Sequence, residues 1–264
     1  MSIGTHALVN ARCGKLAAQV IHVNDLHLSF GEKRVLEGVS LSVPAGCIYA
    51  LIGPGAAGKS VLLKAIAGLL PPSRGSIQLL GRDLVALSER ERMDVRRDVG
   101  MLFQNYALFD YLTVGENIAF PLRRLFDLPE AEIATRVAER LARMSLPGFE
   151  ERLPGGLSGG QKKRVGVARA TVSRPKLILY DEPTAGLDPV TSQRIYDLIR
   201  EEQQKLGTTC VVISSDVAGV FTICDRVAML HHGRIVFEGT RDEALASEIP
   251  VVKQFVHGLV DGPL

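Results

Sequence analysis

Short, uninterrupted apolar runs alternate with segments of helical period along most of the chain. Residues 47–52, 177–180 and 210–213 each form such a run, which is typical of strands buried on both faces of a parallel sheet. Residues 61–70 carry apolar positions at helical spacing directly after the first run, and the alternation continues to about residue 239. The pattern predicts an α/β fold built around a parallel sheet.

The region from about residue 106 to residue 157 breaks this alternation. A helix is expected to begin at Pro129 and Glu130, because apolar residues then recur at helical spacing. These residues, which share one face, are Ile133, Val137, Leu141 and Met144. The sequence therefore predicts a helical subdomain inserted into the α/β core.

The two ends of the chain differ from this central part. Residues 1–18 are expected to be a flexible leader, ahead of a first strand at about residues 20–30. Residues 241–264 are expected to form a C-terminal helical tail with one apolar face. The residues of that face are Val252, Phe255, Val256 and Leu259. Between leader and tail, residues 19–240 are expected to form one domain.

The composition limits the class of protein. The 264 residues suffice for a full α/β core, and 31 basic against 29 acidic residues give no electrostatic case for nucleic acid. Charge, Gly or Pro interrupts every apolar stretch well before it could span a bilayer, and residues 1–18 lack the apolar core of a signal peptide. Cys13, Cys47, Cys210 and Cys224 lack metal-ligand spacing and are expected to be buried, reduced thiols. These features favour a soluble cytosolic protein.

A glycine-rich loop follows the first apolar run and precedes the helical segment. It matches G-x-x-x-x-G-K-[ST] in the strand–loop–helix context of a phosphate-binding loop, whose backbone N–H groups hold phosphate oxygens. Lys59 would neutralise the β- and γ-phosphates of a nucleotide, and Ser60 would offer its hydroxyl to Mg²⁺. The alternative is a glycine-rich loop that only changes the direction of the chain between the strand and the helix. The loop consists of Gly53, Pro54, Gly55, Ala56, Ala57, Gly58, Lys59 and Ser60.

Two carboxylates close a later apolar run. Asp181 and Glu182 follow residues 177–180, and open α/β sheets bind ligands at the carboxyl ends of their strands. Asp181 is expected to hold Mg²⁺ through water. Glu182 is expected to face the γ-phosphate as a general base or as the group that orients the attacking water. A solvated turn is the alternative for such a pair, but the phosphate loop requires a metal partner.

A second helix start is suited to anion binding. Ser158 and Gln161 form an S-x-x-Q capping box. Gly159 and Gly160 leave backbone N–H donors exposed at the positive end of the helix. A plain helix cap would use the same residues. In a chain that already has a phosphate loop, however, this motif predicts a nucleotide held between two surfaces.

These motifs, in this order, resemble the nucleotide-binding subunits of ATP-binding-cassette (ABC) transporters over about residues 19–240. The resemblance implies an ABC-type P-loop ATPase core with an N-terminal antiparallel β subdomain, which binds ATP and Mg²⁺ as a homodimer. By position, it assigns catalytic roles to Gln104, Glu182 and Ser215, metal binding to Ser60, Gln104 and Asp181, and the D-loop to Leu187 and Asp188. Besides the phosphate loop, the nucleotide-binding positions are Phe30, Val61, Ser158, Gly159, Gly160 and Gln161.

Two positions depart from the family pattern. Ala56 replaces a usual glycine, and only a small loss of backbone freedom is expected from it. Ser215 precedes Asp216 where the family has a switch histidine, and a serine side chain is shorter and stays neutral. Hydrolysis is therefore expected to be slow. His231 and His232 lie in a predicted hairpin turn and do not obviously replace the missing histidine.

Narrower resemblances concern the membrane partner. Residues 105–114 concentrate aromatic side chains after Gln104, where ABC ATPases form a groove for the coupling helix of a permease. Residues 101–109, residues 120–122 and the tail 252–258 with its ending at 261–263 are similar to the ATPase of bacterial Mce/Mla lipid transporters. This resemblance implies phospholipid transport between the inner and outer membranes.

The same resemblance implies a set of partners and a location. The partners are an integral-membrane permease pair, an Mce-domain lipid-binding subunit and a small cytosolic accessory subunit, with the ATPase on the cytoplasmic face of the inner membrane. The alternatives are the ATPase of another importer or exporter, for an amino acid, peptide or metal, and a non-transport or regulatory ABC ATPase.

Overall fold

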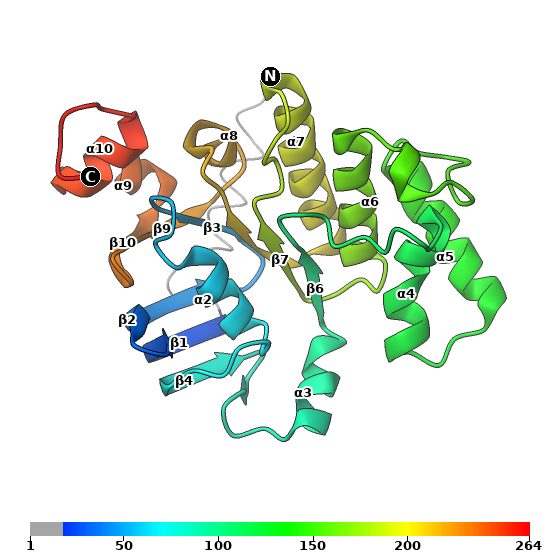
Figure 1. Cartoon of the computed structure of the whole chain (residues 1–264), viewed down its shortest axis with the longest axis horizontal. Coiled ribbons are helices and arrows are strands. Elements are labelled where there is room, and N and C mark those ends of the chain that lie inside the picture. The colour runs from blue at the N-terminus through cyan, green and yellow to red at the C-terminus, as the bar shows by residue number, and fades with distance from the viewer. Residues whose placement is uncertain (1–17) are drawn as a thin grey trace.

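The computed structural model describes residues 18–264, which form an α/β arrangement with two sheets (Figure 1). Residues 1–17 of the expected leader, with Cys13, lie outside the described residues. The larger sheet has the strand order β10-β9-β3-β8-β7-β6. All its strands run parallel except β10, which pairs antiparallel with β9. The strands are β3 (Ile48–Ile52), β6 (Val99–Leu102), β7 (Leu177–Asp181), β8 (Thr209–Ile213), β9 (Arg226–His231) and β10 (Arg234–Thr240).

A smaller antiparallel sheet comes from the N-terminal part of the chain. Its strand order is β2-β1-β4-β5, which confirms the antiparallel sheet that the family resemblance implied. Its strands are β1 (Gln19–Phe30), β2 (Lys33–Pro44), β4 (Arg74–Leu79) and β5 (Arg82–Asp83), and the short helix α3 (Glu89–Arg96) follows them.

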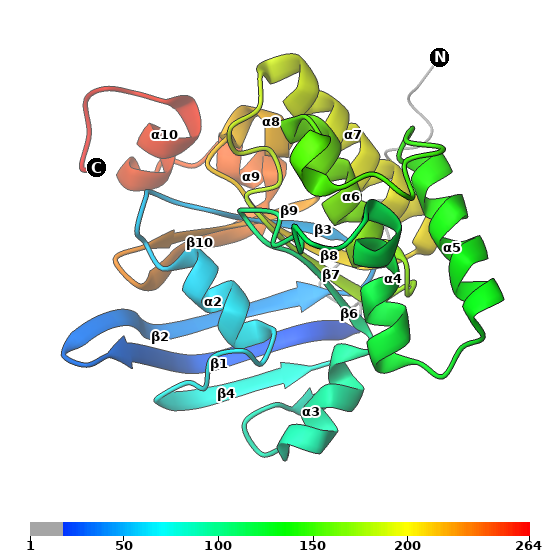
Figure 2. The ribbon, with the colours of Figure 1, turned by 45° about the vertical axis from the view of Figure 1, so that its right-hand side comes forward.

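The larger sheet separates two hydrophobic cores. Ile48 of β3 packs in one core with α6 (Gly159–Thr171) and α7 (Pro189–Leu206). Its neighbour Tyr49 packs in the other core with α2 (Lys59–Ile66) and the antiparallel sheet. Because both faces are covered, β3 is buried throughout and reads as an uninterrupted apolar run. The phosphate-loop helix α2 and the capping-box helix α6 therefore lie on opposite faces of the sheet (Figure 2).

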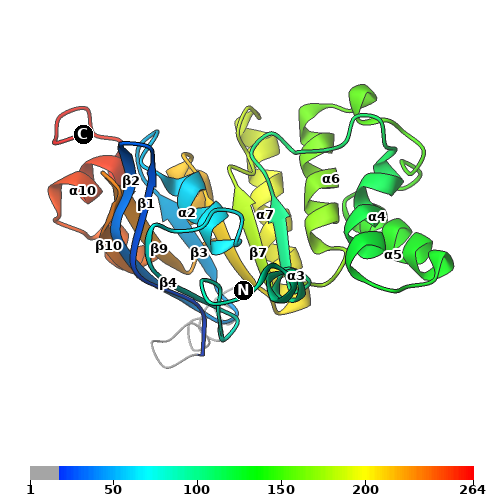
Figure 3. The ribbon, with the colours of Figure 1, turned by 60° about the horizontal axis from the view of Figure 1, so that its bottom comes forward.

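Helices α4 (Val114–Leu125) and α5 (Glu130–Arg143) stand beside α6, at the end of the molecule away from β1 and β2 (Figure 3). A short 3-10 turn, η1 (Pro154–Gly156), leads into α6. The structure starts α5 after Pro129, as the sequence predicts. The expected apolar face is buried in the core shared with α6 and α7, and its members are Ile133, Val137, Leu141 and Met144.

A buried ion pair ties α5 to α7. Arg140 donates to the carboxylate of Glu202, and the side chains are 5% and 1% exposed. Glu202 also lies 3.7 Å from the guanidinium of Arg143. Removing one partner of such a pair leaves an uncompensated buried charge. The pair therefore makes the packing of the helical region on α7 sensitive to single substitutions.

Glu202→Ala is expected to lower the free energy of unfolding by about 3–5 kcal/mol, because Arg140 then stays buried without its carboxylate. Urea denaturation followed by circular dichroism measures the change. Glu201→Ala is the matched control, since Glu201 is 62% exposed and pairs only loosely with Lys205, an arrangement that contributes about 0–1 kcal/mol. Equal losses in the two variants would contradict the assignment.

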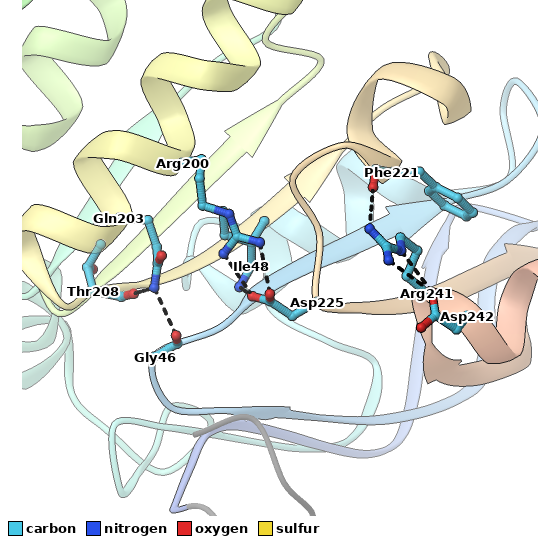
Figure 4. A network of polar contacts seen from close by, with 9 residues as sticks. All are labelled: Gly46, Ile48, Arg200, Gln203, Thr208, Phe221, Asp225, Arg241 and Asp242. Atoms are coloured by element: carbon cyan, nitrogen blue, oxygen red, sulfur yellow. Dashed lines mark hydrogen bonds and ion pairs between the residues drawn. The ribbon is translucent and has the colours of Figure 1, made fainter. Parts of the chain in front are cut away.

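Asp225 joins α7 to the strand that leads into the phosphate loop (Figure 4). Its carboxylate accepts hydrogen bonds from Arg200 of α7 at 2.9 Å and from the backbone N–H of Ile48 at 2.8 Å. Gln203, one turn further along α7, donates to the carbonyl oxygen of Gly46 at 2.8 Å. These bonds fix the position of α7 relative to β3.

The tail is helical, but its apolar face is shorter than expected. Helices α9 (Arg241–Leu245) and α10 (Pro250–His257) follow β10 and the small helix α8 (Val217–Phe221) precedes β9. Val252 is fully buried in the core that contains α7. The expectation for Leu259 is wrong, because the chain leaves the helix at Gly258 with a φ of 63° and Leu259 is 48% exposed. Val252 thus packs within its own chain, whereas Ile249, Leu259 and Val260 remain exposed.

The described cysteines are buried: Cys47, Cys210 and Cys224. Burial raises the pKa of the Cys224 thiol to about 12, so this side chain stays a neutral thiol at physiological pH. In the part of the chain that the structure describes, no helix is both long enough and apolar enough to cross a membrane.

Candidate functional site

The loop between β3 and α2 has a backbone that demands glycine. Gly53 has a φ of 143°, and a Cβ there would lie 2.1 Å from the carbonyl oxygen of Leu230. Gly58 has a φ of 103°, a conformation that glycine adopts without steric cost. Ala56 also lies in the left-handed region, at a φ of 59°, which costs an L-residue about 1–2 kcal/mol. The effect of alanine at this position is therefore larger than the sequence led us to expect.

Lys59 begins α2 and folds back over this loop. Its Nζ donates to the carbonyl oxygens of Gly53 at 2.7 Å and Pro54 at 2.8 Å. Burial lowers the pKa of Lys59, while the nearby carboxylates of Glu182 and Asp181 oppose that shift. The loop, the ammonium and the two carboxylates therefore form one site, in which a phosphate would replace carbonyl oxygens as the partner of Lys59.

The structure brings Ser60 and Asp181 into contact, and the sequence predicts both as metal ligands. Ser60 Oγ donates to Asp181 Oδ1 at 2.9 Å. Burial raises the pKa of Asp181, and the hydrogen bond from Ser60 partly opposes this. Hydroxyl and carboxylate oxygens are ligands that Mg²⁺ prefers, and it usually takes phosphate and water oxygens besides one or two protein groups. The pair fits that ion, although no cluster of three or more His, Cys, Asp or Glu side chains suited to a metal occurs in residues 18–264.

Glu182 and Ser215 are also in direct contact. The backbone N–H and the Oγ of Ser215 both donate to Glu182 Oε2 at 3.1 Å. The contact arises because β7 and β8 are parallel neighbours, so the residues after each strand emerge at the same edge of the sheet. Glu182 has a φ of 50°, and its own N–H donates to the carbonyl oxygen of Ile213 at 3.1 Å. Ser215, the residue of the predicted switch position, therefore contacts the predicted catalytic carboxylate directly.

Gln104 reaches this group of residues through its backbone, while its side chain is exposed. Its carbonyl oxygen accepts a hydrogen bond at 2.9 Å from Lys163 of α6, which also donates to the carbonyl oxygen of Glu182 at 2.9 Å. Lys163 is fully buried, and burial lowers its pKa to about 8 against the opposing charges of Glu182 and Asp181. The sequence pattern does not mark Lys163 as a residue of the site. Its one signal is that Lys163 lies one helical turn before the apolar residue Val167.

The capping box at the start of α6 is present as predicted. Ser158 Oγ accepts from the N–H of Gln161 at 3.3 Å, and the Gln161 side chain accepts from the N–H of Ser158 at 2.9 Å. The D-loop residue Asp188 caps α7 in a similar way, by accepting from Thr191 at 2.9 Å. α6 and α2 cover opposite faces of the sheet, and the neighbours of Gly159 and Gly160 at the start of α6 are Leu187, Tyr106 and Thr191 rather than the phosphate loop.

A cavity of about 540 Å³ borders the phosphate loop. Phe30 ends β1 with 51% of its surface exposed. It is not one of the residues that line the cavity, but its partner in the hairpin, Lys33, is. His231 ends β9 and His232 begins the turn to β10, so only His232 lies in the turn that the sequence predicts for both. Both histidines line the cavity, which the sequence did not indicate. The far wall comes from the tail at Leu264, a position that no local sequence pattern could place.

A second depression lies beside the helical region. It measures about 330 Å³ and includes aromatic and apolar side chains from both sides of the segment after β6. The sequence predicts a groove for a coupling helix at residues 105–114, and two residues of that segment, Ala107 and Phe109, line this depression. The lining includes Met101, Phe103, Ala107, Phe109, Phe120 and Pro121.

Comparison with known proteins identifies relatives over nearly the whole chain. Residues 36–185 match the family described as ABC transporter. The probable ribonucleotide transport ATP-binding protein mkl of Mycobacterium tuberculosis is 42% identical, over 92% of this chain and 68% of that protein. The methionine import ATP-binding protein MetN of Carboxydothermus hydrogenoformans is 41% identical, over 93% of this chain and 74% of that protein.

Two further similarities concern lipid transport and assembly. The intermembrane phospholipid transport system ATP-binding protein MlaF of Escherichia coli is 37% identical, over 94% of this chain and 92% of that protein. Among solved structures, the dimeric post-hydrolysis state of the ATP-binding cassette MJ0796 bound to ADP and Pi has a TM-score of 0.78. That cassette is 30% identical, over 84% of this chain and 98% of the solved one.

Proposed function

The chain belongs to the ABC transporter family, and we propose that it is the ATP-hydrolysing subunit of a transporter that moves phospholipid between bacterial membranes. The proposal of ATP hydrolysis rests on two hydrogen bonds at the edge of one sheet. One joins Ser60 to Asp181, and the other joins Ser215 to Glu182. These are the groups that phosphoryl transfer to water requires, because its catalysis is mainly positioning and charge neutralisation.

Each residue of the site has a distinct task in this proposal. The phosphate loop binds ATP, and Lys59 neutralises the charge of the β- and γ-phosphates. Ser60 and Asp181 hold Mg²⁺, which supplies further charge neutralisation on the phosphate oxygens when it is bound. Glu182 orients the attacking water and accepts its proton on Oε1 or Oε2. Phe30 stacks on the adenine ring, since its side chain is exposed at the end of the hairpin whose Lys33 lines the cavity next to the loop.

A homodimer completes the site. Within one chain the start of α6 and the phosphate loop lie on opposite faces of the sheet, so Ser158 of one copy would close over ATP held by Lys59 of the other. The similarity to the dimeric cassette MJ0796 supports this arrangement. Two such composite sites per dimer follow from two-fold symmetry.

Mixing Lys59→Ala and Ser158→Arg chains tests the composite site. Each variant alone is expected to hydrolyse almost no ATP, because both of its sites lack one half. Random mixing gives half heterodimers, each with one intact site, so up to about a quarter of the parental rate should return. A mixture as inactive as the separate variants would refute the sandwich arrangement.

A membrane permease is the expected partner of this ATPase. The apolar groove beside Phe103 and Phe109 has the character needed to receive an amphipathic coupling helix. The similarity to MlaF supports phospholipid as the cargo. The proposal also includes an Mce-domain subunit, a small accessory subunit and attachment to the cytoplasmic face of the inner membrane, which the motif resemblance implies. The similarity to MetN favours the main alternative, the ATPase of an importer for another substrate.

Purification of the chain with its native membrane partners separates these alternatives. Mass spectrometry is expected to find a multi-helix permease, a lipid-binding subunit and co-purified phospholipid. Recovery of a permease with a periplasmic amino-acid-binding protein instead would support the importer. Recovery of the chain without any membrane protein would favour a regulatory nucleotide binder.

A further inference from the structure

Lys163 is an unusual residue in the core of this chain. Its side chain is fully buried, and its ammonium contacts two backbone carbonyl oxygens and the ring of Tyr106, with Nζ 4.7 Å from the ring centroid. Burial of an ammonium group costs free energy that only close polar partners offset. Here those partners belong to two separate segments of the site.

The two carbonyl oxygens belong to Gln104 and Glu182, which are 59 and 19 residues from Lys163 in the sequence. Both distances are 2.9 Å. One cation therefore joins the segment after β6 to the residue after β7. Those segments carry Gln104 and Glu182, to which the family resemblance assigns catalytic roles.

Both segments have left-handed backbone conformations at residues other than glycine. Glu182 has a φ of 50°, and Tyr106 and Ala107 have φ values of 61° and 48°. Such conformations persist only where surrounding contacts fix them. Lys163 supplies one of these contacts, and Arg169, further along α6, donates at 2.6 Å to the carbonyl oxygens of both Tyr106 and Ala107.

We propose that Lys163 is a positioning residue for ATP hydrolysis, which fixes the backbone of Gln104 and Glu182 so that their side chains converge on the attacking water. This inference rests on the proposed ATPase function. Lys163 does not touch the reacting atoms, since its ammonium is occupied by the two carbonyl oxygens and the aromatic ring. Its effect on the rate passes through the backbone of Gln104 and that of Glu182, whose carboxylate also contacts Ser215.

Substitution of Lys163 is expected to lower the rate of ATP hydrolysis without weakening ATP binding. Lys163→Met keeps an unbranched side chain of similar length but removes all three donors, so the two carbonyl oxygens lose their partner. Misplacement of a catalytic group by about 1 Å can cost about 10²-fold in rate. We expect kcat to fall about 10- to 100-fold, with KM for ATP and the affinity for a fluorescent ATP analogue within about twofold. Lys163→Gln retains amide donors and should recover part of kcat.

Lys162→Met is the matched control, because Lys162 is the adjacent lysine of the same helix and is only half-buried. It should leave kcat unchanged. The thermal midpoint of each variant is measured alongside the kinetics. A fall in kcat that simply follows the thermal midpoint, with KM and nucleotide affinity changing together, would make Lys163 a structural residue and overturn the proposal. An unchanged kcat in Lys163→Met would overturn it as well.

A double variant shows whether Lys163 acts through Glu182. Once Glu182 is Gln, its backbone position no longer controls proton transfer and only the contact with Gln104 can still act, so adding Lys163→Met should lower the remaining rate by a smaller factor than it lowers the parental rate. Losses that multiply would mean that Lys163 acts elsewhere. If Glu182→Gln alone hydrolyses ATP as fast as the parent, the proposed catalytic function fails, a result distinct from failure of the role of Lys163.

Discussion

Replacing Glu182 by Gln is expected to lower the ATPase rate about 10²- to 10⁴-fold, the range that a general base contributes. The amide cannot take a proton from water, yet its oxygen can still accept the hydrogen bonds that Ser215 now donates to Glu182 Oε2. The site should therefore keep its shape. Mg²⁺ and ATP binding should remain close to parental, because Lys59, Ser60 and Asp181 are unchanged.

The same variant should accumulate as an ATP-bound dimer. If hydrolysis is what reopens the composite site, blocking it shifts the equilibrium toward the closed pair, which light scattering with MgATP would detect as a doubled mass. Glu201→Gln makes the same chemical change at a glutamate that is 62% exposed and should hydrolyse ATP normally. Equal rates in Glu182→Gln and in the parent would remove Glu182 from the catalytic role.

The strands were predictable where burial on both faces made the sequence uniform. β3, β7 and β8 are buried at every position, so each reads as an apolar run without alternation. The phosphate loop and the capping box were predictable for a different reason. Their geometry needs particular residue types at fixed local spacing, such as glycine at Gly53 and a serine three residues before Gln161.

Features that depend on contacts between distant segments were not predictable from local pattern. The role of Lys163 follows from carbonyl oxygens on two other elements. The cavity wall at Leu264 follows from the path of the chain after α10. The expectation for Leu259 failed because helical spacing continues past Gly258, whereas the backbone does not. Sequence periodicity shows which residues could share a face, and the end of the helix decides which of them do.

Ser215→His is expected to raise kcat while leaving KM for ATP similar. Ser215 contacts Glu182 through both its N–H and its Oγ, and a histidine would keep the backbone bond and extend a longer donor toward the γ-phosphate. One preorganised donor to developing charge is worth roughly 2.7–4 kcal/mol, or about 10²–10³ in rate. That range is the upper bound of the gain, because the serine hydroxyl can reach the phosphate through water.

Ser215→Ala separates the two roles of the side chain. Alanine removes the hydroxyl bond to Glu182 but adds no donor, so an increase in kcat in both variants would trace to release of the carboxylate. An increase in Ser215→His alone would trace to the new imidazole, and the insensitivity of KM would show that it acts in the transition state. Steady-state ATPase assays with the permease present distinguish these cases. If Ser215→His is no faster than the parent, another group already stabilises the developing charge or residue 215 does not occupy the switch position, and the alignment of residues 213–216 with the family must be abandoned.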